Sequence, residues 1–211
     1  VLHKAEDILQ INDWIQEGGK SQFTFQTNSK ESKPVKVNSD VWGSYQKKNF
    51  RTAIATIELL QEKIQVSENA IVEGLSNVRS STYFLGRCQV VSDKPAILFD
   101  SAHNVDGMRA LLEQVDTLDF QNLHVVFAAV KDKKLDSVLD VLPSKARYYI
   151  TRPDIPRALD EKDLEVLFRK EGFDAKSFPR SSDALAVARQ AASDKDLILV
   201  CGSIFLVAEL I

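Results

Sequence analysis

The chain has 211 residues, of which 44% are hydrophobic, and its 27 Lys and Arg residues against 30 Asp and Glu residues give a formal net charge of −3. This length suffices for one large domain or two small ones with a buried core. Acidic and basic residues are interspersed, so the charge pattern does not favour nucleic acid or an anionic membrane as a partner. No apolar run approaches the ~20 residues that span a bilayer, and residues 1–14 lack the apolar core of a signal peptide. We therefore expect a soluble protein of the cytoplasm.

The N-terminal part of the chain predicts helices and little sheet. Its periodicity indicates a helix near residues 4–16 and two more at about 45–63 and 67–77. The polar stretch at 22–40 is typical of a β-hairpin. A segment with so little sheet of its own is expected to be part of a larger domain, and we place its end at residue 84.

The sequence "GGKS", residues 18–21, looks like the end of a phosphate-binding loop. That loop requires G-x-x-x-x-G-K-[ST], and the position five before Gly19 is Trp14. We therefore predict a helix C-terminal cap followed by a turn.

From residue 85 onward, short apolar runs alternate with amphipathic helical patterns. This alternation predicts a doubly wound α/β domain over residues 85–211, with a mostly parallel sheet and helices on both faces. The expected strands lie at 88–91, 96–100, 123–130, 146–151, 173–178 and 196–202, and the expected helices at 104–118, 134–141, 160–171, 181–192 and after Gly202. Cys88 and Cys201 each lie beside such a strand, and two cysteines support neither a disulfide framework nor a zinc site. We expect buried free thiols.

The stretch "DSAHN", residues 100–104, joins an expected strand to an expected helix. Open α/β sheets bind ligands at the carboxyl ends of their strands. Asp100 could accept hydrogen bonds from a sugar hydroxyl, and His103 could contact a phosphate or a carboxylate. The alternative is helix capping by Asn104, which leaves the acid and the imidazole unexplained.

Four other places could carry chemistry, each with a plainer alternative. Asn49 could read the edge of a base, or could be a satisfied buried amide. Arg87 is either a phosphate ligand or a solvated charge between domains. Lys131 and Asp132 end a strand on the same sheet edge as "DSAHN", or form a solvated loop. Ser203, between a strand and a helix, could hold a carboxylate or simply cap a tight turn.

Taken together, these stretches resemble the folylpolyglutamate synthase/dihydrofolate synthase family of the Mur ligase superfamily. Five motifs match in order: "YQKKN" (45–49), "LGRCQVV" (85–91), "DSAHN" (100–104), "AAVKDKK" with "IPRALD" (128–134 and 155–160), and "VCGSIFLVAEL" (200–210). The departures are Leu85 where the family often has Pro, Gln89 where it often has Glu, and Val105 where Pro is common.

The resemblance implies an ATP-dependent ligase that adds L-glutamate to folate or dihydropteroate through an acyl phosphate. Residues 1–84 would be the C-terminal part of the central ATPase domain and 85–211 the glutamate-ligase domain. The cofactors would be ATP and Mg²⁺, but the P-loop and the magnesium ligands lie upstream of these residues in the family. The fragment would therefore be inactive alone. Family members are generally monomers.

Carried over by position, the resemblance gives a role to five residues. Asn49 would bind the adenine, Arg87 the ATP phosphates, and Asp100 the ribose. His103 would line the same cleft, and Ser203 would lie where the carboxylate of the incoming glutamate is held, so that both would belong to the catalytic site.

Two other functions remain open. One is another Mur-type ligase, which adds an amino acid to a cell-wall precursor. The other is a non-catalytic α/β domain for nucleotide binding or protein interaction. A Rossmann oxidoreductase is disfavoured, because no G-x-G-x-x-G follows an expected strand.

Overall fold

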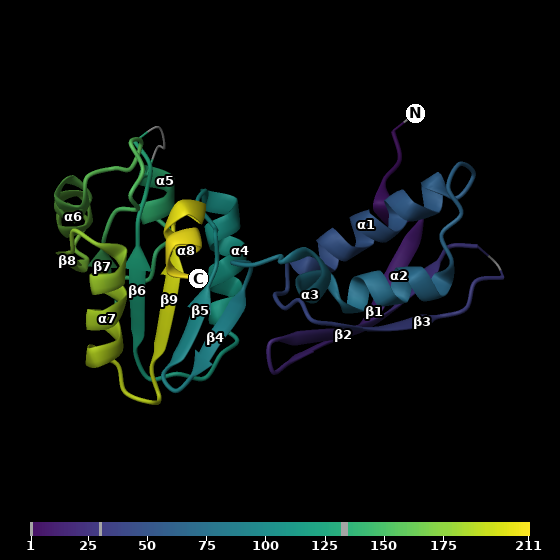
Figure 1. The fold of residues 1–211 in the computed structure, drawn as a ribbon, viewed down its shortest axis with the longest axis horizontal. Coiled ribbons are helices and arrows are strands. Elements are labelled where there is room, and N and C mark those ends of the chain that lie inside the picture. The colour runs from purple at the N-terminus through teal and green to yellow at the C-terminus, as the bar shows by residue number, and fades with distance from the viewer. Residues whose placement is uncertain (1, 30, 132–134) are drawn as a thin grey trace. The chain divides into compact units, whose positions relative to one another are not determined.

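The structure is a computed structural model that describes residues 2–29, 31–131 and 135–211. It divides into two compact units, Val1–Leu85 (unit 1) and Gly86–Ile211 (unit 2). Figure 1 shows unit 1 in purple to blue and unit 2 in teal to yellow. The division falls one residue after the boundary expected from the sequence. The end of the "AAVKDKK" motif, including Asp132, lies outside the described residues.

Unit 1 is a three-stranded antiparallel sheet packed against helices, with strand order β1-β2-β3. Its hydrophobic core joins the strands to the helices through residues such as Phe23, Phe50, Ile54 and Leu75. The elements are the 3₁₀ helix η1 (Ala5–Asp7), strands β1 (Leu9–Glu17), β2 (Lys20–Thr27) and β3 (Val35–Ser39), and helices α1 (Gln46–Leu60), α2 (Glu68–Ser76) and α3 (Val78–Thr82). The expected polar hairpin and the two expected helices are confirmed as β2–β3, α1 and α2.

The helix expected near residues 4–16 is wrong, because most of this segment forms strand β1. A β-bulge explains the error. Asn12 pairs with Thr24 and Ile15 with Gln22, so Asp13 and Trp14 together oppose the single residue Phe23. The extra residue shifts the two-residue alternation by one position, and the apolar residues then fall at a spacing that also fits a helix.

The glycine pair Gly18–Gly19 therefore does not cap a helix. It forms the two-residue turn of the β1–β2 hairpin, in which Glu17 pairs with Lys20. Both glycines have positive φ, 56° and 73°. This backbone matches the type I′ turn that tight hairpins favour and that glycine adopts without strain.

Unit 2 contains a six-stranded sheet of order β4-β5-β9-β6-β7-β8. Only the edge pair β4–β5 is antiparallel, and the other pairs are parallel. The strands are β4 (Gln89–Asp93), β5 (Ala96–Phe99), β6 (Leu123–Phe127), β7 (Arg147–Ile150), β8 (Asp174–Ser177) and β9 (Leu197–Cys201). Every residue of β6 and β9 is buried, as expected for central parallel strands covered on both faces.

Helices cover both faces of this sheet, which confirms the doubly wound α/β fold. Val126 and Val200 belong to a cluster with residues of α7 (Ser181–Ala191) and α8 (Ile204–Leu210). On the opposite face, Phe127 and Tyr148 pack against Phe168 of α6, with ring centroids 5.2 and 5.1 Å apart. Helices α4 (Val105–Val115), α5 (Asp136–Leu139) and α6 (Glu161–Lys170) make the remaining connections. Figure 1 shows α4 and α5 behind the sheet and α8 in front of it.

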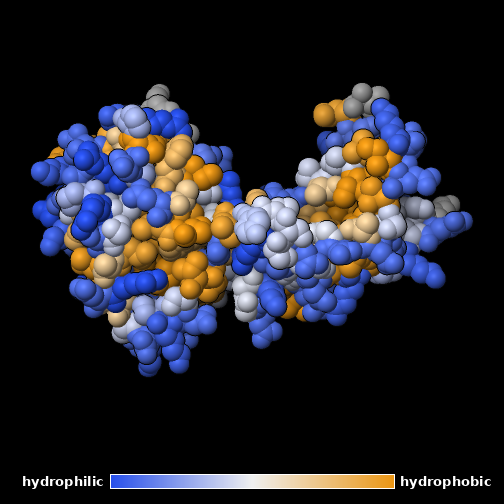
Figure 2. Space-filling model, viewed as in Figure 1, coloured by the Kyte–Doolittle hydropathy of each residue, from blue (hydrophilic) through white to orange (hydrophobic). Residues whose placement is uncertain are grey.

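Hydrophobic residues also reach the surface of unit 2. Figure 2 shows them in orange around the position that α8 occupies in Figure 1. Ile204 and Ile211, near the two ends of α8, are each about half exposed. Among the residues that the structure describes, no helix combines the length and apolar character needed to cross a membrane.

A buried polar network ties together the amino-terminal ends of β6 and β9. The carboxylate of Asp196 accepts hydrogen bonds from the backbone N–H groups of Asn122 (2.9 Å) and Ser193 (2.7 Å) and from the Asn122 amide (2.8 Å). His124 lies 3.7 Å from the same carboxylate, and its Nδ1 is 2.9 Å from the Tyr149 hydroxyl. Burial lowers the pKa of His124, against the opposing effect of Asp196.

Asp196 makes the stability of unit 2 depend on pH. Burial alone would raise the pKa of this carboxyl, but the hydrogen bonds from Ser193 and Asn122 outweigh it and lower the pKa to about 2. Because the folded pKa lies below the ordinary value of 3.8, the stabilisation is complete above about pH 4 and is lost as the pH falls towards 2.

We expect Asp196→Asn to remove this pH dependence and to lower the free energy of unfolding at neutral pH by about 2 kcal/mol. Both tryptophans, Trp14 and Trp42, lie in unit 1. Urea unfolding should therefore be followed by the methyl NMR signals of Val125 and Leu199. The exposed neighbour Asp194→Asn is the matched control. An unchanged pH profile in Asp196→Asn would contradict the assignment.

Candidate functional site

Asp100 follows β5 directly and is buried, with 2% of its surface exposed. Its backbone N–H donates to the carbonyl of Val200 (2.9 Å), which continues the β5–β9 pairing. Its Oδ2 accepts from the N–H of Cys88 (2.8 Å) and its Oδ1 from the N–H of Ala102 (2.7 Å). The carboxylate therefore fastens the end of β5 to the segment that precedes β4.

This fastening fixes the backbone on both sides of Arg87. The N–H of Ser101 donates to the carbonyl of Gly86 (2.9 Å), one residue before Arg87, and Asp100 holds Cys88, one residue after it. Cys88 has a φ of 46°, a left-handed conformation that costs energy for a residue with a side chain. Arg87 itself is half-buried. Asp100 thus positions Arg87, whereas a contact of either residue with a nucleotide stays a prediction.

His103 has one ring nitrogen committed to the same turn. Its Nδ1 lies 3.0 Å from the carbonyl oxygen of Ser101. A carbonyl oxygen only accepts hydrogen bonds, so this geometry assigns the proton to Nδ1. In the neutral ring, Nε2 then carries the lone pair and can accept a proton or a hydrogen bond.

A second turn, after β9, meets the first one. The N–H of Gly202 donates to the carbonyl of Ala102 (2.9 Å). Gly202 has a φ of 95°, and a Cβ atom there would lie 2.5 Å from the carbonyl oxygen of Ala128, so this close approach requires glycine. Ser203 is buried and caps α8, with its Oγ accepting from the N–H of Phe205 (3.2 Å). The plainer alternative, capping, is therefore present in the structure, and a role in binding a carboxylate stays a prediction.

The two turns open onto a pocket of about 250 Å³. This is smaller than the pockets of roughly 300–1,000 Å³ that hold drug-sized ligands, and it suits a small molecule. No carboxylate side chain occurs among the described residues that line it. The lining residues are His103, Val130, Arg157, Gly202, Ser203, Ile204 and Phe205. The structure thus brings together two of the predicted residues, His103 and Ser203.

Arg157 and Phe205 were not assigned a role from the sequence. The Arg157 guanidinium lies 4.7 Å from the centroid of the Phe205 ring. A β-bridge between Val130 and Ala158, far apart in the chain, brings Arg157 to the pocket. The motif "IPRALD" matches the family, but nothing in the sequence indicates that Arg157 lines the same pocket as Ser203.

The remaining predicted residues lie elsewhere. Asn49 is exposed on α1 in unit 1, and its amide nitrogen donates to Oε1 of Gln46 (2.7 Å). This bond satisfies one donor of the amide, but the side chain is exposed, so the alternative of a buried amide is wrong. The adenine contact stays a prediction. Lys131 directs its Nζ to the carbonyl of Pro156 (3.4 Å) and lines a neighbouring pocket.

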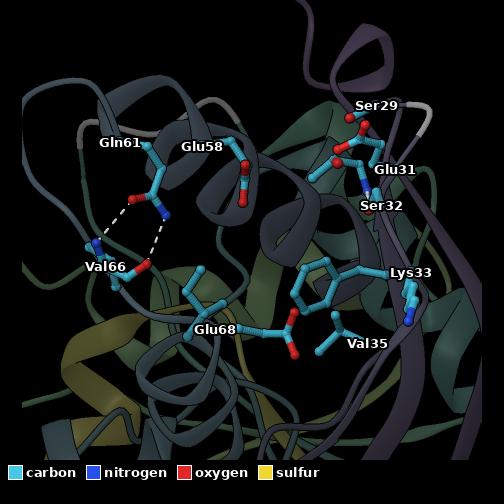
Figure 3. Close-up of a pocket in the computed structure, with 12 residues that line it drawn as sticks. Ser29, Glu31, Ser32, Lys33, Val35, Glu58, Gln61, Val66 and Glu68 are labelled. Carbon is cyan, nitrogen blue, oxygen red and sulfur yellow. Dashed lines mark hydrogen bonds between the residues drawn. The ribbon is translucent and has the colours of Figure 1, made fainter.

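Two further pockets among the described residues have less suitable polar groups for an anion. The pocket of unit 1, about 520 Å³ in volume, is lined by the carboxylates of Glu31, Glu58 and Glu68, and Figure 3 shows both amide atoms of Gln61 bonded to the backbone of Val66. In the neighbouring pocket of unit 2, about 580 Å³, the two arginines already pair with acids. These pairs are Arg152 with Asp160 and Glu161, and Arg180 with Asp183.

No group of three metal-ligating side chains occurs within residues 2–29, 31–131 and 135–211. The described residues therefore form no such ligand cluster of their own.

A mostly parallel α/β sheet with a small pocket at the carboxyl ends of its central strands defines a domain of the doubly wound α/β class. Residues 86–204, more than half of the chain, match the family model for the Mur ligase, glutamate ligase domain. The chain belongs to this family, which confirms the resemblance found in the sequence.

Curated relatives agree with this assignment. The chain is 28% identical, over 99% of its length, to the probable bifunctional folylpolyglutamate synthase/dihydropteroate synthase of Haloferax volcanii. It is 32% identical, over 76% of its length, to the dihydrofolate synthase/folylpolyglutamate synthase of Escherichia coli. The chain spans 26% of the first protein and 36% of the second.

Solved structures share the fold. The folylpolyglutamate synthase of Mycobacterium tuberculosis, solved in complex with ADP and AMPPCP, superimposes with a TM-score of 0.79 at 21% identity. The match covers 96% of this chain and 47% of that one.

We expect Asp100→Asn to loosen the segment around Arg87. The Asp100 carboxylate accepts hydrogen bonds from two backbone N–H groups. The amide of Asn would place its own donor against one of them, which should lower the free energy of unfolding by about 2 kcal/mol. Hydrogen exchange at the amides of Cys88 and Ala102 should accelerate, with Asp106→Asn, on the exposed side of α4, as the control. If Asp100 served only as a nucleotide ligand, exchange in the free protein would not change.

We expect the neutral ring of His103 to be protonated at Nδ1. Nitrogen-15 NMR distinguishes the two tautomers directly, and the exposed His3 provides a reference in the same chain. Detection of the Nε2–H tautomer would contradict the hydrogen bond to Ser101.

Proposed function

We propose that unit 2 binds the amino acid in an ATP-dependent ligase that joins L-glutamate to folate or dihydropteroate. One observation carries this proposal. The small pocket at the ends of β9 and β6 presents His103, Arg157 and Ser203 together, and the described residues that line it include no acid. Such a pocket favours a carboxylate ligand. The names of the relatives supply the identity of the acceptor.

The reaction needs a proton acceptor near the amino acid. In this class of reaction the folate carboxylate takes the γ-phosphoryl group of ATP, and ADP leaves. The amine of glutamate then attacks the acyl phosphate, phosphate departs, and an amide forms. Glutamate enters as an ammonium ion, which must lose a proton before its nitrogen can attack. The Nε2 lone pair of His103 is suited to accept that proton.

Ser203 is suited to orient the amino acid. Its Oγ uses a lone pair to accept from the N–H of Phe205, which leaves the hydroxyl proton available to a carboxylate. Binding and positioning of the amine would then be coupled, because the turns that carry Ser203 and His103 are joined by the bond from Gly202 to Ala102.

For the nucleotide, we propose that Arg87 binds the phosphates. The main contribution of Asp100 would be to hold the backbone around Arg87. The ribose contact of Asp100 and the adenine contact of Asn49 remain part of the proposal. Magnesium would be held by residues outside those that the structure describes.

For the chain as a whole, we propose that residues 1–84 correspond to the end of the central ATPase domain and 85–211 to the glutamate-ligase domain. The 211 residues contain no P-loop, so we expect no ATP hydrolysis from them alone. Cys88 and Cys201 are both buried and neither forms a disulfide in the described part of the chain, which suits the reducing cytoplasm. We also propose that the protein acts as a monomer.

The test uses the protein as its organism makes it, assayed for ATP-dependent addition of glutamate. We expect Ser203→Ala to raise the KM for glutamate by about tenfold, the loss of one charge-assisted hydrogen bond, with little change in the KM for ATP. Asn104→Ala is the matched control, because Asn104 also caps a helix, through its bond to Gly107 (2.8 Å), but does not line the pocket. Equal effects of the two substitutions on the KM for glutamate would reject the role of Ser203, and absence of glutamate addition by the wild type would reject the proposed function.

A further inference from the structure

Strand β8 forms one edge of the sheet of unit 2. The strand order ends at β8, and in the described part of the chain this strand pairs with β7 alone. Figure 1 shows it at the outer side of the sheet, near α6. An edge strand presents unpaired backbone N–H and C=O groups, which can pair with a strand of another molecule. How these groups are occupied therefore decides whether the sheet can grow.

The backbone groups of β8 that face away from β7 belong to Ala175 and Ser177. The N–H of Phe178 donates to the carbonyl of Ile150 in β7 (2.8 Å). Successive residues of a strand direct their backbone groups to opposite sides, so those of Ser177 and Ala175 point to the open side. An added strand would have to bond these groups.

Two side chains of α6 already bond them. The Nε of Arg169 donates to the carbonyl of Ala175 (3.0 Å). The Oε2 of Glu165 accepts from the N–H of Ser177 (2.9 Å). Arg169 Nη2 also lies 2.8 Å from Glu165 Oε1, so the two side chains form an ion pair. This pair offers β8 one donor and one acceptor, as a residue of a neighbouring strand opposite Lys176 would.

The charge of Glu165 keeps the ion pair in place at neutral pH. Hydrogen bonding from Ser177 lowers the pKa of the Glu165 carboxyl, and the charge of Arg169 adds to this effect, whereas burial opposes it. Because the pKa lies below its ordinary value, the carboxylate stays ionised and remains an acceptor for the N–H of Ser177.

The opposite edge of the sheet is protected in another way. The pairing of β4 with β5 shifts register between Val90 and Ser92, which leaves Val91 as an extra residue in β4. Such a β-bulge interrupts the regular row of bonding groups that a further strand would need. The regular edge of β8 has no such register shift in its pairing with β7, so its protection depends on side chains.

We propose that Glu165 and Arg169 occupy the bonding positions of a seventh strand and thereby prevent β8 from pairing with β8 of a second copy of the chain. A second copy fits this edge because the edge is self-complementary. In an antiparallel pair centred on Lys176, Ala175 of one copy lies opposite Ser177 of the other, and the two residues can exchange both backbone bonds.

Lys176 would weaken the same pairing. It is exposed on β8, and the two-fold symmetry would place it opposite its own copy, where like charges repel. This inference is independent of the proposed function, because neither Glu165 nor Arg169 lines the pocket that holds His103 and Ser203.

The test measures self-association of the protein as its organism makes it, by sedimentation velocity over a range of concentrations. Glu165→Ala combined with Arg169→Ala removes one charge of each sign and should lower the dissociation constant for self-association by at least roughly tenfold relative to the wild type. Adding Lys176→Thr should lower it further, by up to about fivefold.

The matched control is Arg180→Ala combined with Asp183→Ala. These two residues form an ion pair at the start of α7, and their side chains bond each other. The substitutions remove the same two charges from unit 2 and should leave self-association as in the wild type.

Hydrogen exchange identifies the surface that associates. In the dilute double variant of α6, the amide of Ser177 should exchange faster than in the wild type, because it has lost its acceptor. At high concentration, residues 174–177 should become protected as a new strand pairs with them. Exchange in β6 and β9 should match the wild type, as evidence that unit 2 is folded.

The outcomes are distinct. Concentration-dependent association with protection of residues 174–177 supports the inference. Folded variants that sediment like the wild type at every concentration, or that associate while residues 174–177 stay unprotected, overturn it. If the double variant does not fold, Arg169→Ala alone decides in the same way, because it removes a side chain that is 62% exposed and frees only the carbonyl of Ala175.

Discussion

The insertion of β9 between β5 and β6 is the constraint on which the candidate site depends. β9 is the last strand of the chain, yet it pairs in parallel with both neighbours, and all of its residues are buried. This placement brings the turn at Gly202 against the turn at Ala102, where one backbone hydrogen bond joins them. Because the sheet core fixes the carboxyl ends of its strands, the residues after β5, β6 and β9 meet without a long loop to hold them.

Sequence patterns were a good guide to unit 2 and a poor one to the start of unit 1. In unit 2, continuous apolar strands alternate with amphipathic helices, and the two signals differ in both length and period. In β1, the bulge at Asp13 breaks the strand alternation, and the bond from Thr24 to the Asp13 carboxylate (2.8 Å) holds this irregularity. The extra residue places Trp14 against Phe23 in the core, with ring centroids 5.4 Å apart. The spacing of apolar residues in one sequence cannot reveal a β-bulge, because the bulge is defined by the pairing of that strand with its neighbour.

The same contrast holds for the site. The position of His103 and Ser203 at the carboxyl edge of the sheet could be predicted, because each follows a strand and precedes a helix. Arg157 could not, because it lies in a loop and reaches the pocket through a bridge between two segments that carry no periodic signal. The carboxylate of Asp100 had an obvious ligand interpretation from sequence, but its burial and its two backbone partners become visible only in three dimensions.

Two of the three departures of this sequence from its family pattern, Gln89 and Val105, are explained by the backbone that Asp100 and its neighbours hold. Gln89 stands where the family often has Glu, and its Oε1 accepts from the N–H of Gly86 (2.9 Å), a bond that an amide oxygen and a carboxylate oxygen can both provide. Val105 stands where Pro is common, and it is the first residue of α4 after the Asn104 cap, a position at which proline is favoured because no backbone N–H is needed there. What this region requires is an acceptor near Gly86 and a helix start at residue 105. Side chains that differ in charge or in ring structure can satisfy those requirements equally, so these two departures leave the geometry around Arg87 and His103 intact.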